Sequence, residues 1–193
     1  MKLKKSKGKN MIITISGKPG SGKSTLADSI AKILHMKRYS VGGFRRQQAK
    51  KRGMTLEEYN KLGEKEAFTD KDADEWQKEI GKKEDNFIID GRLSYHFISH
   101  SIKIFLDVSP EVGSERIRAA NREGELMKSK KEALKMWQTR YKSDIERYKK
   151  YYNLYPYDKK NYDFVLDTSN LKIEEATDKV LDFLKIQKNS KHL

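Results

Sequence analysis

The clearest chemical motif in the sequence is a glycine-rich segment near the amino terminus. Residues 17–24, GKPGSGKS, match the pattern G-x-x-x-x-G-K-[ST] at every fixed position. In this pattern the glycines let backbone N–H groups converge on a phosphate, and the lysine, here Lys23, reaches the terminal phosphates. The hydroxyl of the last residue, Ser24, is a suitable ligand for Mg²⁺. The segment therefore predicts binding of a nucleoside triphosphate with magnesium.

A carboxylate that helps to hold this magnesium is expected at the end of another apolar strand. Asp90 ends the run NFIID at residues 86–90 and is followed by Gly91 and Arg92. Asp107 ends the run IKIFLD and is the alternative. A glycine that allows close approach and an arginine that matches phosphate geometry favour Asp90. A turn or helix-capping role is open for either aspartate.

Arginine occurs in several separate segments, and this distribution bears on what receives a phosphoryl group. A hydroxyl acceptor needs a general base, whereas an acceptor phosphate is already ionised and needs positive charge around it. Guanidinium groups from different segments can supply that charge. They are Arg45, Arg92, Arg116, Arg118, Arg122, Arg140 and Arg147. For a hydroxyl acceptor the conceivable bases are Asp70, Asp72 and Asp74, but we interpret these aspartates as solvated helix charge.

A long helix is predicted over residues 131–152, where apolar and aromatic residues recur on one face. The residues on that face are Leu134, Trp137, Tyr141, Ile145, Tyr148 and Tyr152. A rotation of about 100° per residue places Arg140, Asp144 and Arg147 in a narrow stripe roughly 90° away, at the margin of the buried face. We expect this stripe to line a cleft. An ordinary row of surface ion pairs is the alternative.

These residues need a sheet whose strands end at one edge, and short apolar runs of that kind occur along the chain. The predicted strands are residues 11–16, 39–41, 86–90, 102–108 and 162–167, of which 39–41 is the weakest. Apolar spacing predicts helices at 22–35 and 173–186. The order of strand, glycine loop and helix predicts an α/β fold. We expect a P-loop NTPase-type parallel sheet of about five strands flanked by helices, with a ligand-binding carboxyl edge.

The composition excludes several classes of protein. The 193-residue chain has 42 basic and 28 acidic residues and a net charge of +14, which attracts the phosphates of nucleotides or nucleic acids. It contains no cysteine, so disulfides and thiolate metal sites are excluded. No apolar stretch is long enough to cross a bilayer and no signal peptide is recognisable. We expect a cytoplasmic protein that acts as a monomer.

Nucleic-acid binding is a second hypothesis for the basic residues. The first ten residues, MKLKKSKGKN, carry five lysines and predict a flexible basic arm that could make weak, nonspecific contact with nucleic acid. Tyrosines alternate with lysines at residues 148–157, and such a pattern can stack on unpaired bases. We interpret these tyrosines mainly as a helix end packed on the core.

In their order along the chain, the motifs resemble the cytidylate kinases of the nucleoside monophosphate kinase group, most closely those of the archaeal type. The matching segments are ITISGKPGSGKSTLA, SVGGFRRQQAKKRGMTLEEYN, IIDGRLS, KIFLDVSPEVGSERI, the spaced R-Y-K-S-D-I-E-R-Y, and YDFVLDTSNL, which cover about residues 11–187. The resemblance implies transfer of the γ-phosphoryl group of ATP, with Mg²⁺, to CMP or dCMP. Another monophosphate, UMP or AMP, or a hydroxyl metabolite is the alternative acceptor.

The resemblance also implies roles for individual residues. The catalytic residues would be Lys23, Arg122 and Arg140, with Arg122 in a lid that closes on ATP and Arg116 or Arg118 as alternatives to it. The ATP-binding residues would be Gly17, Lys18, Pro19, Gly20, Ser21, Gly22, Lys23, Ser24, Thr25, Thr168 and Ser169. The acceptor would be bound by Ser40, Arg45, Gly91, Arg92, Arg140, Asp144 and Arg147. The metal would be held by Ser24 and Asp90.

We expect the chain to divide into a single P-loop kinase domain at 11–187, the basic arm at 1–10, which lies outside the resemblance, and a tail at 188–193. The core of the domain would comprise residues 11–42, 84–120 and 136–187. Small helical insertions would lie over the carboxyl edge of the sheet: one that binds the monophosphate at about 43–83, and the lid at about 121–135.

Overall fold

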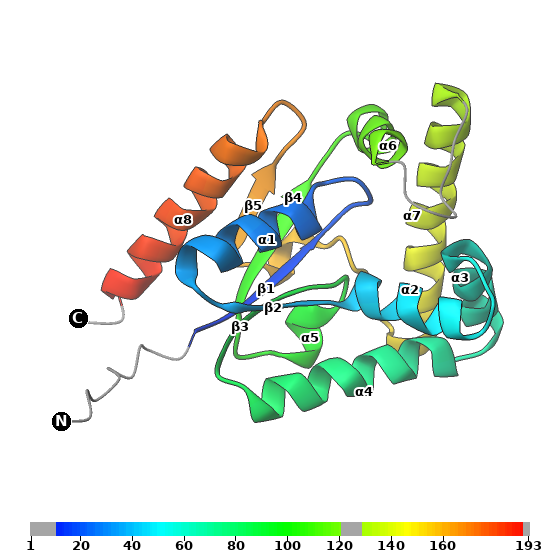
Figure 1. Cartoon of the computed structure of the whole chain (residues 1–193), viewed down its shortest axis with the longest axis horizontal. Coiled ribbons are helices and arrows are strands. Elements are labelled where there is room, and N and C mark those ends of the chain that lie inside the picture. Colours follow the sequence, from blue (N-terminus) through cyan, green and yellow to red (C-terminus); the bar gives the residue numbers. More distant parts are fainter. Residues whose placement is uncertain (1–10, 121–128, 191–193) are drawn as a thin grey trace.

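Five parallel strands form one twisted sheet at the centre of the molecule (Figure 1). The structure is a computed structural model that describes residues 11–120 and 129–190, without the side chains of 186–190. The strand order is β2-β3-β1-β4-β5, and every neighbouring pair is parallel. The strands are β1 (Met11–Gly17), β2 (Lys37–Ser40), β3 (Asn86–Asp90), β4 (Ile102–Asp107) and β5 (Phe164–Asp167). The predicted α/β fold with a five-stranded parallel sheet is confirmed.

Helices connect the strands and cover both faces of the sheet. They are α1 (Lys23–Leu34), α2 (Val41–Lys51), α3 (Leu56–Lys65), α4 (Phe68–Lys83), α5 (Ser94–Phe97), α6 (Pro110–Ala119), α7 (Lys130–Tyr152), the 3-10 turn η1 (Lys159–Asn161) and α8 (Ile173–Ser190). In Figure 1, α1 and α8 lie along one face, and α4 with α5 along the other. None of the helices in the described ranges is long and apolar enough to span a bilayer.

The strand predicted at 39–41 is wrong at both ends. The strand is β2, Lys37–Ser40, and Val41 already belongs to α2. The hydroxyl of Ser40 accepts a hydrogen bond from the backbone N–H of Gly43 at 3.1 Å, so Ser40 caps the helix. The strand therefore ends one residue earlier than its apolar residues suggest.

The sheet is held between two groups of apolar side chains, since its central strands are buried on both faces. One group joins the sheet to α1 and α8 and includes Ile13, Ile15, Leu26, Ile30, Ile88, Ile104, Val180 and Leu184. The other joins it to α2, α4 and the end of α5 and includes Ile12, Val41, Ala73, Phe87, Ile89 and Ile98. These two layers fix the strands and so fix the loops at their carboxyl ends.

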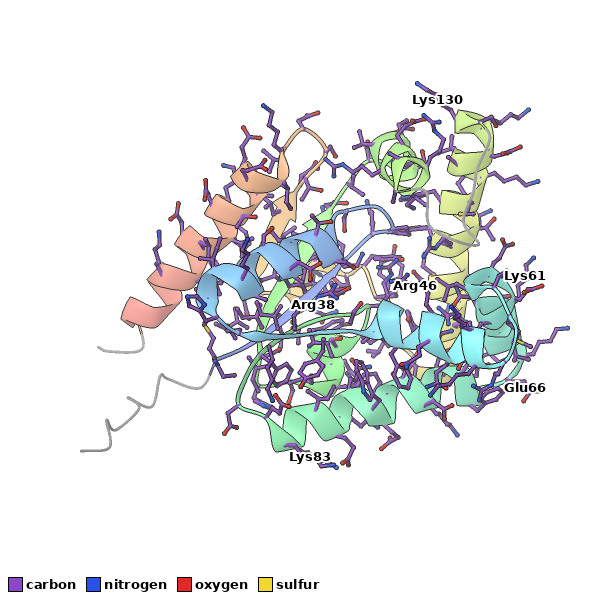
Figure 2. The ribbon with its side chains drawn as sticks, in the orientation of Figure 1. Arg38, Arg46, Lys61, Glu66, Lys83 and Lys130 are labelled. Carbon is purple, nitrogen blue, oxygen red and sulfur yellow. The ribbon has the colours of Figure 1, made fainter. Side chains whose placement is uncertain are left out.

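The charged segment between β2 and β3 is helical, as predicted, and consists of α2, α3 and α4. Many of its charges are solvated, and Figure 2 shows Lys61, Glu66 and Lys83 at the periphery. Asp70 and Asp74 are different, because they are 3% and 7% exposed. The interpretation of both as solvated helix charge is therefore wrong, whereas Asp72 is exposed as expected.

Candidate active site at the carboxyl edge of the sheet

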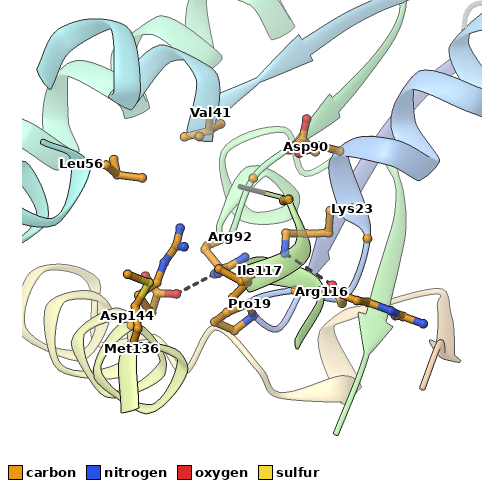
Figure 3. A pocket seen from close by; sticks show the side chains of 18 of the residues that line it. Pro19, Lys23, Val41, Leu56, Asp90, Arg92, Arg116, Ile117, Met136 and Asp144 are labelled. Carbon is orange, nitrogen blue, oxygen red and sulfur yellow. Dashed lines mark hydrogen bonds and ion pairs between the residues drawn. The ribbon is translucent and has the colours of Figure 1, made fainter. Parts of the chain in front are cut away.

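A cavity of about 760 Å³ lies at the carboxyl edge of the sheet (Figure 3). It is lined by the loop between β1 and α1, by α2 and α3 on one side, by α6 and α7 on another, and by the start of α8. The strand order changes direction beside β1, and open parallel sheets bind ligands at such a switch point. The cavity therefore lies at the edge of the sheet where the sequence predicts a ligand site.

The glycine-rich loop holds Lys23 over its own backbone. The ammonium of Lys23 donates to the carbonyl oxygens of Gly17 at 3.0 Å and of Lys18 at 2.9 Å. Burial, and after it the nearby Arg92, hold the pKa of Lys23 well below its usual value, while Asp90 and Asp144 act in the opposite direction. A triphosphate would bring negative charge to this ammonium and restore its proton affinity.

Close packing fixes the shape of the loop. Gly20 has φ of 73°, a left-handed conformation that favours glycine, and a Cβ there would meet the carbonyl oxygen of Gly113 at 2.0 Å. Gly113 lies in α6, and a Cβ on it would meet the indole nitrogen of Trp137 at 2.6 Å. The loop therefore presses against α6 at Gly20, and α6 presses against α7 at Gly113, two positions where only glycine fits.

Ser24 and Asp90 meet at the start of α1. The hydroxyl of Ser24 donates to Oδ2 of Asp90 at 3.0 Å, and Ser40 donates to the same oxygen at 3.2 Å. Nη2 of Arg38 lies 2.9 Å from the other carboxylate oxygen. Asp107, the alternative, is engaged by Lys18 at 2.7 Å and by Lys159 at 2.6 Å. The structure thus joins Asp90, and not Asp107, to Ser24.

The pair of Ser24 and Asp90 fits the requirements of Mg²⁺. A hydroxyl and a carboxylate are hard oxygen ligands, and Mg²⁺ is commonly bound by one or two protein oxygens together with phosphates and water. Asp90 is 4% exposed, and it forms an ion pair with Arg38. No group of three or more acidic or histidine side chains suited to a metal occurs in those ranges, so this two-ligand arrangement is the candidate.

A chain of alternating charges runs along one side of the cavity. Nη1 of Arg45 lies 2.8 Å from Asp70, and Nη1 of Arg147 lies 3.0 Å from the same carboxylate. Nη2 of Arg147 then reaches Asp144 at 2.9 Å, and Asp144 accepts from Nε of Arg92 at 2.7 Å. Arg92 ends the chain by donating to the carbonyl of Gly17 at 2.8 Å. We call the three arginines and two aspartates the charge chain.

The charge chain orients the guanidinium groups by pairing them. Although burial alone would raise it, Arg92 and Arg147 hold the pKa of the Asp144 carboxyl well below its usual value. The residue is therefore ionised throughout the neutral range. Three arginines face two aspartates, so the chain carries net positive charge where it borders the cavity.

The remaining predicted acceptor residues are placed as follows. Arg140 lines the cavity, and its charge contributes to lowering the pKa of Lys23. Gly91 also lines the cavity, whereas Ser40 is used in the helix cap and in the contact with Asp90. Arg122, predicted to close on ATP, lies outside the described residues. The structure describes the second half of the predicted lid, from Ser129 onward, as the start of α7.

The other end of the cavity is formed by the loop after β5. Arg116 donates to the carbonyl of Thr168 at 2.7 Å and to its hydroxyl at 3.1 Å, and both residues line the cavity. Ser169 points elsewhere, with its hydroxyl on Asp167 at 2.6 Å. Arg116 is thus fixed to this loop, and Arg118 pairs with Glu115 at 2.9 Å at the surface. The two alternatives for a lid arginine are both engaged.

The tyrosines of residues 148–157 are mostly structural. Tyr148 and Tyr157 are 7% and 5% exposed, and Tyr157 donates to Asp144 at 2.8 Å while stacking on Tyr141 at 4.6 Å. The hydroxyl of Tyr152 donates to Asp74. Tyr155 is 47% exposed. The interpretation of this segment as a helix end packed on the core is confirmed.

Comparison with known proteins identifies the family to which this site belongs. A family model described as the cytidylate kinase-like family matches residues 12–170. The chain is 34% identical over 182 residues to a cytidylate kinase of Archaeoglobus fulgidus, which covers 92% of this chain and 97% of that protein. This chain belongs to the cytidylate kinase-like family.

Other matches place this member of the cytidylate kinase-like family among its relatives. The chain is 36% identical over 172 residues to an S-adenosylmethionine-dependent nucleotide dehydratase of Lacinutrix mariniflava, covering 88% of this chain but 35% of that protein. A solved shikimate kinase of Aquifex aeolicus superposes with a TM-score of 0.56 at 23% identity, covering 93% of this chain and 98% of that chain. This second likeness concerns the fold alone and confirms the P-loop kinase architecture.

The sequence does not predict the contacts of three residues in this cytidylate kinase-like site. Arg38 contacts Asp90 from a strand too polar to be recognised in full. Asp70 holds two arginines, although Lys71 and Asp72, which follow it in the sequence, are exposed charges. Trp137 is predicted on the buried face, but its indole N–H also bonds the carbonyl of Pro19 in the phosphate loop at 2.8 Å. Its place one turn before the polar stripe of α7 is the one signal in the sequence for this anchor.

Proposed function

We propose that the protein transfers the γ-phosphoryl group of ATP to CMP, and to dCMP, with Mg²⁺. The observation that carries this proposal is the charge chain: three guanidinium groups from separate elements border the cavity beside a glycine-rich loop built for a triphosphate. Two phosphate groups repel each other, so an enzyme that joins them must surround both with positive charge. The archaeal relatives are named cytidylate kinases, which supports CMP as the acceptor.

In the proposed reaction the bond from the γ-phosphorus to its bridging oxygen breaks, and ADP leaves with the electron pair. An oxygen of the CMP phosphate forms the new bond, which gives CDP. Lys23 and Arg140 would neutralise charge on the transferred group, and Arg122 would join them from the lid. Mg²⁺ held by Ser24 and Asp90 would neutralise further phosphate charge. The chain otherwise acts by holding the reactants in line, which can supply a large part of the rate.

This reaction needs no general base, and the surroundings of the candidate bases agree. Asp70 is ion-paired to two arginines and remains an acceptor rather than a free base. Asp74 receives hydrogen bonds from Tyr152 and Gln77 and does not line the cavity. Asp72 is at the surface. A hydroxyl acceptor would therefore lack an unpaired carboxylate among these three.

The same proposal assigns a ligand to each end of the cavity. We assign the acceptor to the end of the cavity lined by α2 and α3, in the insertion at about 43–83, and by the middle of α7. We assign the adenine of ATP to the end lined by Arg116 and Thr168, and residues 121–135 to a lid. Arg147 would lie toward the cytosine and Asp144 toward the ribose.

An assay of ADP release tests the proposal. ATP and Mg²⁺ would be supplied with the monophosphates of cytidine, deoxycytidine, uridine, adenosine or guanosine, and with shikimate and gluconate as hydroxyl controls. We expect strong turnover with CMP and dCMP. Turnover with shikimate or gluconate alone would contradict the acceptor assignment while leaving the triphosphate site intact. Absence of turnover with every acceptor would favour the nucleic-acid hypothesis instead.

A further inference from the structure

One face of α3 lines the acceptor end of the cavity. Leu56, Asn60 and Glu64 are spaced by four residues, so they share a face of the helix, and all three line the cavity. Figure 3 shows Leu56 across the cavity from Asp144 and Met136 of α7. An acceptor whose phosphate faces the glycine-rich loop must extend its base away from that loop. This face of α3 is therefore placed to contact the base.

Arg45 fixes the orientation of the Asn60 amide. Nη2 of Arg45 lies 3.0 Å from Oδ1 of Asn60. A guanidinium can only donate, so the atom that faces it must be the amide oxygen, and the NH₂ group points the other way. Arg45 is itself buried and held by Asp70 at 2.8 Å. Asn60 thus offers a donor of fixed direction.

Ser143 fixes the carboxylate of Glu64. The hydroxyl of Ser143 donates to Oε1 of Glu64 at 2.6 Å, which leaves Oε2 outside this hydrogen bond. The end of α3 is also fastened to α7, since Lys150 donates to the backbone carbonyl of Glu64 and Tyr151 to that of Gly63, both at 2.8 Å. An ionised carboxylate accepts hydrogen bonds and cannot donate them. Glu64 thus offers an acceptor held against α7, one turn from Asn60.

The other cavity-lining carboxylates on this side are committed to protein partners. Asp144 accepts from Arg92, Arg147 and Tyr157. Glu57, on the neighbouring ridge of α3, pairs with Lys61 at 3.0 Å. Glu64 differs from both because its described side-chain partner is a neutral hydroxyl.

We propose that Asn60 and Glu64 determine base specificity by reading the pairing edge of the acceptor base, an inference that rests on the proposed function. Cytosine presents an acceptor, N3, beside a donor, the N4 amino group. The Asn60 donor and the Glu64 acceptor complement this pair. Uracil presents the reverse, an N3–H donor beside the O4 acceptor. The Asn60 donor would then face a donor, and the Glu64 acceptor would face an acceptor. The site is thereby matched to amino-pyrimidine monophosphates and rejects keto-pyrimidine ones.

Titration calorimetry of CMP and UMP with the full chain and its Glu64→Gln variant tests this inference. The amide keeps the size of the side chain but can turn a donor toward O4 of uracil. We expect the ratio of the UMP to the CMP dissociation constant to fall by about tenfold or more. The variant loses one hydrogen bond to CMP, and it no longer leaves an unpaired group opposite O4 of UMP. Glu57→Gln makes the same charge change on the same helix and should leave the ratio unaltered.

The outcomes separate this inference from the proposed function. An unchanged ratio in Glu64→Gln would overturn the inference, and so would an equal fall in Glu57→Gln, because general cavity charge would then explain it. Turnover is measured on the same samples. If the wild-type chain binds CMP in preference to UMP, and Glu64→Gln removes the preference, the inference stands even when no CDP forms. If the wild-type chain binds neither nucleotide, both the inference and the proposed function are overturned.

Discussion

Replacement of Asp70 by asparagine probes the charge chain directly. Asp70 lies in α4, is 3% exposed, and accepts from Arg45 at 2.8 Å and from Arg147 at 3.0 and 3.2 Å. Asparagine has nearly the same shape but no charge. Both guanidinium groups would then remain buried beside a neutral amide that offers a single oxygen to the two of them.

The expected loss of stability can be estimated from these contacts. Removal of one partner from a buried ion pair costs about 3 to 5 kcal/mol. Arg147 keeps its contact with Asp144 at 2.9 Å, and Arg45 keeps Asn60 and the carbonyl of Thr69. The lower end of the range therefore applies, about 3 kcal/mol, or roughly a 100-fold change in the folding equilibrium.

Urea unfolding at neutral pH, followed by tryptophan fluorescence, measures this loss. Asp72→Asn on the same helix is the matched control, because its side chain is 45% exposed and its partner Arg52 is 3.9 Å away. We expect the control to change the free energy of unfolding by less than about 0.5 kcal/mol. If Asp70→Asn stayed within that same range, the pairing of both arginines through Asp70 would be refuted.

Three further predictions concern the loop, its anchor and a buried acid. Lys23→Ala should abolish turnover with every acceptor while the protein stays folded, and retained turnover would refute the loop assignment. Trp137→Phe removes the bond to Pro19; we expect a loss of about 1 to 2 kcal/mol in urea unfolding and a raised KM for ATP, and two unchanged values would contradict the anchor. Burial raises the pKa of Asp74 to about 6, against hydrogen bonds from Tyr152 and Gln77 that lower it. The folded state therefore binds this proton more tightly than the unfolded state, so the stability it contributes is present at low pH and lost as pH rises from about 4 to about 6. Relative to Asp74→Asn, the wild-type free energy of unfolding should fall by up to about 3 kcal/mol over that window, and a constant difference would contradict the shift.

The fold could be predicted in most of its parts because its strands are short, apolar and buried on both faces. Runs such as 86–90 and 102–108 stand out from a highly charged background, and the glycine-rich loop requires a strand before it and a helix after it. The sequence predicts the wrong bounds for the strand at Lys37–Ser40. Its register depends on pairing with β3, and its polar residues carry little β-propensity.

The site could be predicted where local pattern decides it, but not where tertiary contact does. The hydrogen bond between Ser24 and Asp90 follows from two motifs that meet at one edge of the sheet. The burial of Asp70 depends on arginines 25 and 77 residues away in the chain, and no local feature distinguishes it from Asp72. Asn60 and Glu64 likewise share a helix with solvated charges, and only the contact of Asn60 with Arg45 of α2 and those of Glu64 with α7 set them apart.

Phosphorus NMR of the protein with ATP, Mg²⁺ and CMP tests most directly whether the acceptor group is a phosphate. We expect the monoester signal of CMP to disappear as the phosphoanhydride signals of CDP and ADP appear in equal amounts. A CMP signal that stays constant while ATP is consumed to ADP and inorganic phosphate, or while a phosphate ester forms on an added hydroxyl compound, would contradict it.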